Sequence, residues 1–388
     1  MKKVKTYIID SSVLVRRTMA GVVMSMEKAV VQGSSPSGSS KEINAKIRDA
    51  NPDVIVLGMN SKQSAETELF LNIRETFPSL PVLVVTPRSA EGAKVALFAL
   101  KEGAVEYITK PSKSCNLLLA QRHIEKRLKP ALMMIPRLNM DLLSKKTMDE
   151  PAAGDLNKVV GSVSKQITRN IELVAIGGCT GGVQSLFSLI KEIPADLPVP
   201  IVVVQHMPKI YTRMLAAELD ELTPLHVREA TMNSLLVPGQ VYLAPGGFHA
   251  SVKNNGTRKQ ITLHRGPKEH KSRPSIDVLL RSVQHVYDDK VLAVILSGGG
   301  MDGVLGAKEI LDSGGQVILQ DKNSSLLWDL PASIYERGIS AEAYGVEKLG
   351  QEIAKRINID HRQETRMPKR RYRSIHPFNN TDFTSSSL

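Results

Sequence analysis

Residues 171–182 read IELVAIGGCTGG, and this stretch decides the fold of the second half of the chain. An apolar, β-rich segment at 173–176 runs into a turn packed with glycine, and the following VQSLFSLIKEI has the spacing of an amphipathic helix. A strand that turns into a helix through glycines presents one side chain at its tip, beside the free N–H groups of the helix N-terminus. The tip residue is Cys179. We therefore predict a nucleophile elbow whose N–H groups can serve as an oxyanion hole.

Apolar strands alternate with helical patterns over most of the chain. Five such units run from KTYIID to LLLAQRHIEKRL, and a second series has the strands LVAIG, PIVVVQH, QVYLAP, VLAVILS and QVILQ. This alternation predicts an α/β protein with two doubly wound parallel sheets. The expected parts are a first domain at 1–130, a linker at 131–168, a second domain at 169–358 and a basic tail, expected to be disordered, at 359–388.

Composition indicates a globular protein of the cytoplasm. Of 388 residues, 42% are hydrophobic and 23% charged, and no apolar run approaches the about 20 residues of a membrane span. The N-terminus MKKVKTYIID lacks the apolar core of a signal peptide and is interpreted as a strand. Two cysteines, Cys115 and Cys179, make no disulfide framework. We expect a cytoplasmic location and no membrane span.

The net charge of +12 raises the question of a nucleic-acid partner, which we do not expect. Aromatic residues make up only 4% of the chain, and it contains no recognisable nucleic-acid motif. Part of the basic excess lies in the C-terminal stretch RQETRMPKRRYRSIHPFNNTDFTSSSL. That stretch is interpreted as a solvated tail, with docking on anionic lipid or an acidic protein as the alternative.

Three strand ends in the second domain each carry one reactive side chain: Cys179 in IGGCTGG, His206 in IVVVQHMP and Asp302 in VILSGGGMDG. Sites in doubly wound sheets collect outside the carboxyl ends of the strands. Taken singly, each residue has a structural explanation, such as a packed thiol, a surface imidazole or a helix N-cap. Together, a nucleophile, an imidazole and a carboxylate are the parts of a catalytic triad.

The first domain resembles a response-regulator receiver domain over its whole length. That family phosphorylates an aspartate after the third strand, beside a metal held by two acids after the first strand. Here the matching positions are Asp10, Ser11 and Gly58, so one acid and the phosphoacceptor are missing. The switch hydroxyl, aromatic and lysine of the family are matched by Thr86, Tyr107 and Lys110. Mg²⁺ needs several oxygen ligands, and the matching positions supply a single carboxylate. We therefore expect a docking or packing module without aspartyl phosphorylation.

The second domain resembles the chemotaxis protein-glutamate methylesterase (CheB) family. The matching segments, in the family's order, are IGGCTGG, VVVQHMP, LLVPGQVYLAPGGFH, RPSIDVLLRSV, LSGGGMDG and QDKNSSLLWDLPASI. The resemblance implies that Cys179 takes the position of the nucleophilic serine, with His206 as base and Asp302 as the orienting acid. It also implies that the Gly299 N–H polarises the substrate carbonyl, with Thr180 beside the nucleophile.

The resemblance further implies an enzyme that hydrolyses glutamyl methyl esters, and deamidates selected glutamines, on the cytoplasmic helices of methyl-accepting chemotaxis receptors. A chemotaxis histidine kinase is a further implied partner, and no cofactor is implied. The chain departs from the family in its cysteine, in a glycine of SGGGMDG where methionine is usual, and at Asp329-Leu330. A thiol paired with histidine attacks carbonyls well but fits an oxyanion hole shaped for serine poorly. We expect reduced activity, with a dead pseudo-esterase that still binds receptors as the alternative.

A remote alternative uses the same glycines. The run 298–303 satisfies G-x-G-x-x-G after a strand, and Asp321 stands where a ribose-binding acid would be needed, which is typical of a dinucleotide-binding oxidoreductase. Against it, Asp302 places negative charge where the pyrophosphate would lie. His249, His264 and Asp277 form no tetrahedral metal set by spacing, so we expect no metal. His249 is expected to border the site, and Arg273 is either a substrate contact or a helix-start residue.

Overall fold

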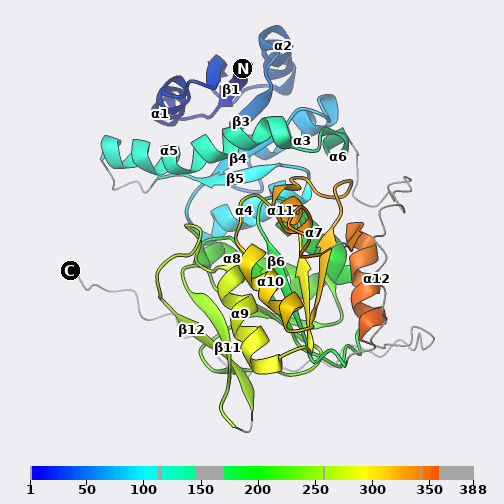
Figure 1. The fold of residues 1–388 in the computed structure, drawn as a ribbon. Helices are drawn as coiled ribbons and strands as arrows, with labels where there is room; N and C mark the ends of the chain where they lie inside the picture. Colours follow the sequence, from blue (N-terminus) through cyan, green and yellow to red (C-terminus); the bar gives the residue numbers. More distant parts are fainter. Residues whose placement is uncertain (1, 112–115, 145–169, 257, 341, 358–388) are drawn as a thin grey trace, which may run out of the picture.

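The structure is a computed structural model that describes residues 2–111, 116–144, 170–256, 258–340 and 342–357. Cys115, most of the expected linker and the basic tail lie outside these residues. Two α/β parts follow one another along the chain, the first in blue to cyan and the second in green to orange (Figure 1). Both have parallel sheets with helices packed on them, which confirms the predicted fold class.

The first part is a five-stranded parallel sheet in the order β2-β1-β3-β4-β5. Its strands are β1 (Val4–Ile9), β2 (Ala29–Ser35), β3 (Val54–Gly58), β4 (Val82–Thr86) and β5 (Glu106–Thr109). Its helices are α1 (Val13–Met24), α2 (Ser40–Ala50), α3 (Ala65–Thr76), α4 (Ala90–Lys101) and α5 (Leu117–Met134). Every residue of β3 and β4 is buried, as expected for central strands covered by helices on both faces.

The second part has a seven-stranded parallel sheet in the order β15-β14-β13-β6-β7-β10-β8. These strands are β6 (Leu173–Gly178), β7 (Ile201–Gln205), β8 (His226–Glu229), β10 (Gln240–Leu243), β13 (Val291–Ile295), β14 (Gln316–Gln320) and β15 (Ala343–Tyr344). The helices are α7 (Gly182–Leu189), the 3-10 turn η2 (Ile190–Glu192), α8 (Lys209–Leu222), α9 (Ile276–Tyr287), α10 (Val304–Asp312), α11 (Asp329–Tyr335) and α12 (Val346–Arg356).

An antiparallel sheet of β9 (Ser234–Leu235), β11 (His249–Asn254) and β12 (Lys259–His264) is inserted before α9. The sequence analysis did not predict it. The turn between β11 and β12 contains Asn255 and Gly256, the latter at φ +94°, and an Asn-Gly pair between two strands is a strong hairpin signal. This signal was in the sequence and was overlooked.

The start of the expected linker is helical. Helix α5 runs on to Met134, and the 3-10 turn η1 (Ile135–Arg137) and the short helix α6 (Met140–Ser144) follow. Leu132, Leu138 and Leu143 are buried against the first part, which gives these residues a packed apolar side. The domain boundaries themselves stay a prediction.

The two parts share an apolar junction. Helix α4 packs against α7 and α8, and buried side chains from both sheets form one continuous hydrophobic cluster. Tyr107 of β5 stacks on Tyr211 of α8, with ring centroids 4.6 Å apart. A second contact joins η1 to the loop before α11, where Arg137 pairs with Asp329 and the Asn139 N–H donates to the Leu326 carbonyl at 3.0 Å. These two contacts place the first part over the carboxyl ends of β6 and β7.

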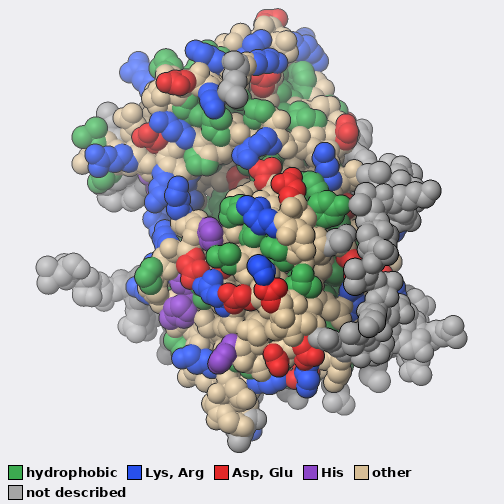
Figure 2. All heavy atoms as spheres, in the orientation of Figure 1, with side chains coloured by type: hydrophobic (Ala, Val, Ile, Leu, Met, Phe, Trp, Pro, Cys, Tyr) green, Lys and Arg blue, Asp and Glu red, His purple; other side chains and the backbone are tan. Residues whose placement is uncertain are grey.

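None of the helices in the described residues is long and apolar enough to cross a bilayer. On the face drawn in Figure 2, Lys and Arg side chains lie over both parts of the molecule, with Asp and Glu side chains among them. The charge on this face is therefore mixed rather than gathered into one basic stripe.

Candidate active site

The strand–turn–helix predicted at 171–182 is present. Strand β6 ends at Gly178, Cys179 follows in the turn, and α7 begins at Gly182. Gln205 fills the space beside this turn, because a Cβ at Gly178 or Gly182 would lie 2.7 or 2.5 Å from its Oε1. The Gln205 Nε2 donates to the Cys179 carbonyl at 2.7 Å. Glycines at these two positions thus let Gln205 brace the turn that carries the nucleophile.

Cys179, His206 and Asp302 lie together. His206 directly follows β7, and Asp302 lies in the loop between β13 and α10. Because the sheet order is β13-β6-β7, the three strand ends are neighbours. The His206 Nε2 lies 2.7 Å from the Asp302 Oδ2, which leaves Nδ1 available for Cys179. The structure therefore assembles a thiol, an imidazole and a carboxylate as the sequence predicted.

Asp302 is held by the N-terminus of α9. Its Oδ1 accepts from the Ser275 hydroxyl at 2.6 Å and from the Asp277 N–H at 3.0 Å, and its Oδ2 also accepts from the Ile276 N–H at 2.9 Å. Burial opposes ionisation, but the hydrogen bonds from His206 and Ser275 outweigh it and keep the pKa of Asp302 below its usual range. The carboxylate is therefore charged and fixed in orientation.

The Cys179–His206 pair favours a thiolate beside an imidazolium. Burial alone would raise the pKa of Cys179, but the charge of His206 and hydrogen bonds from His206 and the Gly299 N–H lower it overall. Burial likewise disfavours charge on His206, yet the neighbouring Cys179 and Asp302 raise the pKa of the imidazole. A thiol in such a pair is an activated nucleophile.

The glycine loop after β13 lies directly against the nucleophile. A Cβ at Gly298 would lie 2.8 Å from the Cys179 Cβ, so a side chain there would collide with the elbow. The Gly298 backbone bonds to Leu327 and Leu330, which positions the next N–H, that of Gly299, at the thiol. The Cys179 N–H is itself bonded to the Ser297 carbonyl at 3.1 Å. Gly299, rather than the N–H of Cys179, is thus placed to donate to a developing oxyanion.

The receiver-like domain covers this site. The Thr180 hydroxyl donates to the Glu106 Oε2 at 2.7 Å, and Glu106 is the first residue of β5. A small cavity of about 30 Å³ remains, lined among others by Glu106, Cys179, Thr180 and His206. A space of this size holds a water molecule but no peptide substrate.

The degenerate receiver site is closed by an internal ion pair. The Lys110 Nζ lies 2.9 Å from the Asp10 Oδ2, and the Asp10 Oδ1 accepts from the Ser12 N–H at 2.8 Å. Gly58 ends β3, and a Cβ there would lie 1.8 Å from the Asp10 Oδ2. The remaining carboxylate thus occupies the space that a phosphoacceptor side chain would need.

The other expected receiver residues serve the junction or the surface. Thr86 ends β4, and its hydroxyl lies 3.1 Å from the Tyr211 hydroxyl in the second domain. Ser11, in the position of the second acid, is exposed between β1 and α1. Its backbone carbonyl accepts from Arg16 at 3.3 Å. Thr86 is therefore committed to an interdomain contact, and Ser11 adds no carboxylate to the site.

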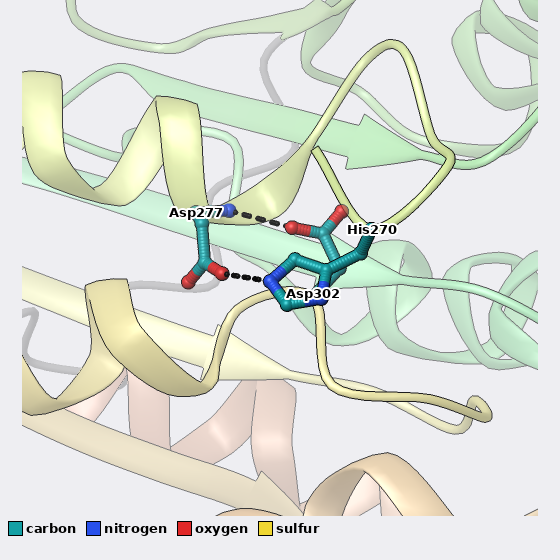
Figure 3. A group of neighbouring side chains, drawn as sticks. All are labelled: His270, Asp277 and Asp302. Carbon is teal, nitrogen blue, oxygen red and sulfur yellow. Dashed lines mark hydrogen bonds and ion pairs between the residues drawn. The ribbon is translucent and has the colours of Figure 1, made fainter. Parts of the chain in front are cut away.

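Three potential metal ligands lie within 4.8 Å of one another: His270, Asp277 and Asp302 (Figure 3). The His270 Nε2 lies 3.1 Å from the Asp277 Oδ2, and the Asp277 Oδ1 accepts from the Gly306 N–H at 2.7 Å. Both oxygens of Asp302 already accept from protein donors, which an ion would have to displace. Asp302 is therefore fully engaged by protein donors, whereas the Asp277 Oδ2 has, among the described residues, only the ion-pair contact with His270, and the expectation of no metal stays a prediction.

Two further candidates have structural contacts. The ring of His249 is buried, and its Nε2 lies 2.8 Å from the Pro267 carbonyl, with His264 tilted against it. The Arg273 guanidinium bonds to the carbonyls of Arg265 and Gly266 at 3.1 and 2.9 Å. Both side chains thus secure the loop that leads from β12 to α9. These contacts support a structural role for Arg273 rather than a substrate contact.

The glycine run 298–303 is accounted for by the triad loop. Asp302 binds His206 and α9, so its carboxylate points inward rather than toward a ligand at the start of α10. Asp321, the expected ribose acid, accepts from the N–H and hydroxyl of Ser324 in its own turn. One oxygen of the carboxylate that the dinucleotide interpretation needs for a ribose is thus engaged within its own turn.

The sequence analysis missed three residues of the site. Ser275 lies within RPSIDVLLRSV, where a serine directly before a helix is an N-cap signal that could have identified it. Gln205 lies next to His206, yet nothing in its sequence context indicates that it braces the elbow. Glu106 reaches Thr180 across 74 positions of sequence, and no local pattern could indicate such a contact.

Comparisons with known proteins identify the families of both domains. The family of the response regulator receiver domain matches residues 6–122, and the CheB methylesterase family matches residues 174–353. A protein of Trichodesmium erythraeum named "Protein-glutamate methylesterase/protein-glutamine glutaminase" is 35% identical over 92% of this chain and 100% of its own length. A Methanosarcina mazei protein, numbered 2 under the same name, is 32% identical over 91% of this chain and 96% of its own length. The crystal structure of the Thermotoga maritima CheB methylesterase catalytic domain is 37% identical, covering 48% of this chain and 98% of that one with a TM-score of 0.47.

Proposed function

The chain belongs to the CheB methylesterase family, and from this premise we propose that it hydrolyses glutamyl methyl esters through Cys179, His206 and Asp302. It is an ester hydrolase of the protein-glutamate methylesterase type, joined to a receiver domain. The observation that carries the catalytic assignment is the contact of His206 with Asp302 at 2.7 Å. His206 lies beside the Cys179 thiol, and although burial raises the pKa of this thiol, His206 lowers it overall.

The proposed reaction has two stages. The Cys179 thiolate attacks the ester carbonyl carbon, and the Gly299 N–H and the Thr180 hydroxyl are the donors next to the oxyanion that forms. Collapse of this intermediate breaks the bond to methoxide, which takes a proton from His206 and leaves as methanol. His206 then deprotonates a water molecule that attacks the thioester, and the thiolate leaves as the glutamate is released.

The thiol makes the first stage the difficult one. A thiolate leaves a tetrahedral intermediate more readily than methoxide does, so the intermediate tends to return to ester. One misplaced oxyanion donor also costs about 10² to 10³ in rate. The alternative of a weak or inactive esterase that binds receptors is favoured by one specific observation, the Glu106 carboxylate that lies against Thr180.

The proposed substrates are glutamyl methyl esters, and selected glutamines, on the cytoplasmic helices of methyl-accepting chemotaxis receptors. The receiver domain suggests a chemotaxis histidine kinase as a further partner, one that docks without transferring phosphate, because Gly58 has no carboxylate. Such substrates place the proposed site of action in the cytoplasm.

Methanol release from methylated receptor fragments tests the proposal. We expect release by the full chain, a loss of at least about 10³-fold in Cys179→Ala and His206→Ala, and an increase in Cys179→Ser if sulfur is the cause of slow turnover. His264→Ala, a change at the exposed last residue of β12, is the control and should keep the wild-type rate. Equal release by wild type and Cys179→Ala would establish the pseudo-esterase instead.

A further inference from the structure

Glu106 brings a carboxylate of the receiver domain into the catalytic cavity. Its Oε2 accepts from the Thr180 hydroxyl at 2.7 Å, and its Oε1 accepts from the Tyr107 N–H at 3.0 Å. Thr180 is the residue directly after the nucleophile, and the same small cavity is lined by Glu106, Cys179 and His206. A glutamate side chain thus lies where a substrate glutamyl group must come to react.

The position of Glu106 is fixed from both sides. The carbonyl of Ala104, two residues before it, accepts from the Gln184 Nε2 of α7 at 2.9 Å. Tyr107, the residue after it, stacks on Tyr211 of α8. Contacts with two helices of the second domain therefore hold the backbone around Glu106 against the site.

Packing alone gives no reason for an acid here. Burial raises the pKa of Glu106, only partly opposed by the hydrogen bond from Thr180, and its charge in turn raises the pKa of the Cys179 thiol. A neutral glutamine could accept from Thr180 equally well without that electrostatic cost. A glutamate carboxylate is, however, the group that methyl-ester hydrolysis produces.

We propose that Glu106 is an internal product analogue, whose carboxylate occupies the subsite that takes the glutamyl acyl group of the substrate. The inference rests on the proposed function and adds to it the place of the acyl subsite, between the Cys179 thiol and the Thr180 hydroxyl. Thr180 is then the donor that recognises the acyl oxygen, and a substrate enters only when Glu106 leaves.

The proposal makes residue 106 a site of self-modification when it carries an amide. In Glu106→Gln, the Cys179 thiolate attacks the side-chain amide carbon, and ammonia leaves with a proton from His206. One water molecule then hydrolyses the thioester, so that the amide and water become glutamate and ammonia. The cavity of about 30 Å³ beside Cys179 is large enough for the water molecule that this step consumes.

The first test is peptide mapping of the full-length Glu106→Gln variant during storage at neutral pH. We expect residue 106 to convert from amide to acid, and no conversion in Glu106→Gln combined with Cys179→Ala. Glu102→Gln, an exposed position at the end of α4 in the same domain, is the matched control and should keep its amide. An amide retained at 106 in a preparation that releases methanol from receptor ester would overturn the proposal.

The second test needs no esterase activity and separates this inference from the proposed function. Removal of the carboxylate should open the small cavity beside the thiol to a small electrophile, so Cys179 in Glu106→Ala should react with iodoacetamide about tenfold faster than in Glu102→Ala. Faster alkylation in a chain that releases no methanol would support the acyl subsite and refute the proposed esterase activity. Equal rates in the two variants would refute the subsite.

Discussion

At the scale of single residues, the reactivity of the site depends on three charges that stabilise one another rather than on the thiol alone. Asp302 stabilises positive charge on His206, and His206 in turn stabilises the Cys179 thiolate. Asp302 is buried and the other two groups are half-buried, so the charge on each group is favourable only while its neighbour is present. The lowered pKa of Cys179 is therefore a property of all three residues.

Asp302→Asn should shift the pH dependence of Cys179. The thiolate is the reactive form, so alkylation by iodoacetamide slows as pH falls through the pKa of Cys179, which is lowered in the wild type despite burial. Loss of the negative charge at 302 lowers the pKa of His206, so the imidazolium stabilises the thiolate less. The pKa of Cys179 therefore rises, and the midpoint of the alkylation rate moves to higher pH. The measurement is the alkylation rate between about pH 5 and 10, which spans the ordinary His and Cys pKa values.

Asp312→Asn is the matched control for this change. Asp312 is exposed at the end of α10 and pairs with Lys308 on the same helix, away from the thiol. Its midpoint should equal that of the wild type. If the alkylation midpoint of Asp302→Asn also equals that of the wild type, Asp302 does not stabilise the Cys179 thiolate through His206.

At the scale of elements, the N-terminus of α9 joins stability to function. The Ser275 hydroxyl accepts from the Val278 N–H at 3.4 Å as the N-cap, and it donates to the Asp302 Oδ1 at 2.6 Å. One hydroxyl thus closes the first turn of the helix and orients the carboxylate of the triad.

Ser275→Ala should therefore reduce both stability and turnover. Loss of the cap costs about 1 kcal/mol, and loss of the hydrogen bond to the charged Asp302 adds about 1.5 to 3 kcal/mol to the decrease in the free energy of unfolding. Ser39→Ala removes the N-cap of α2, whose hydroxyl accepts from the Glu42 N–H at 3.4 Å, without touching the site. Urea unfolding should register both changes, whereas methanol release should fall only in Ser275→Ala. Equal methanol release in the two variants would leave Ser275 with a structural role alone.

Sequence predicts these elements where they carry a periodic pattern. The strand–helix units and the elbow at Cys179 were predicted because their apolar spacing and glycines are local signals. Strand β8 was missed because its sequence, HVRE, has a single apolar residue, and β15 was missed because two residues are too few to establish a period. The meeting of Cys179, His206 and Asp302 was predicted only because all three follow neighbouring parallel strands. The cover by Glu106 depends on how two domains dock, which no local pattern encodes.

At the scale of the whole molecule, the receiver domain has a glycine at the end of β3 and a close contact with the second domain. The Asp10–Lys110 ion pair lies beside Gly58, while Thr86 and Tyr107 both contact Tyr211 of the second domain. The residues that would respond to a phosphoryl group are thus committed to the junction.

We expect no phosphorylation of this receiver. After incubation with acetyl phosphate and Mg²⁺, the intact mass of the chain should be unchanged, because Gly58 offers no carboxylate. Gly58→Asp should not restore the reaction by itself, since its Cβ would lie 1.8 Å from the Asp10 Oδ2. An acid-labile addition on Asp10 or Asp53 in the wild type would contradict this expectation.

The continuous hydrophobic cluster through α4, α7 and α8 also gives the covered site a temperature dependence. Parting the two domains would expose its apolar side chains to water, and hydration of such surface carries a large positive heat capacity. Because the attraction between apolar surfaces weakens on cooling, cold favours the uncovered site and moderate warmth favours the covered one. We therefore expect alkylation of Cys179 to report a site that is more accessible in the cold than at moderate warmth.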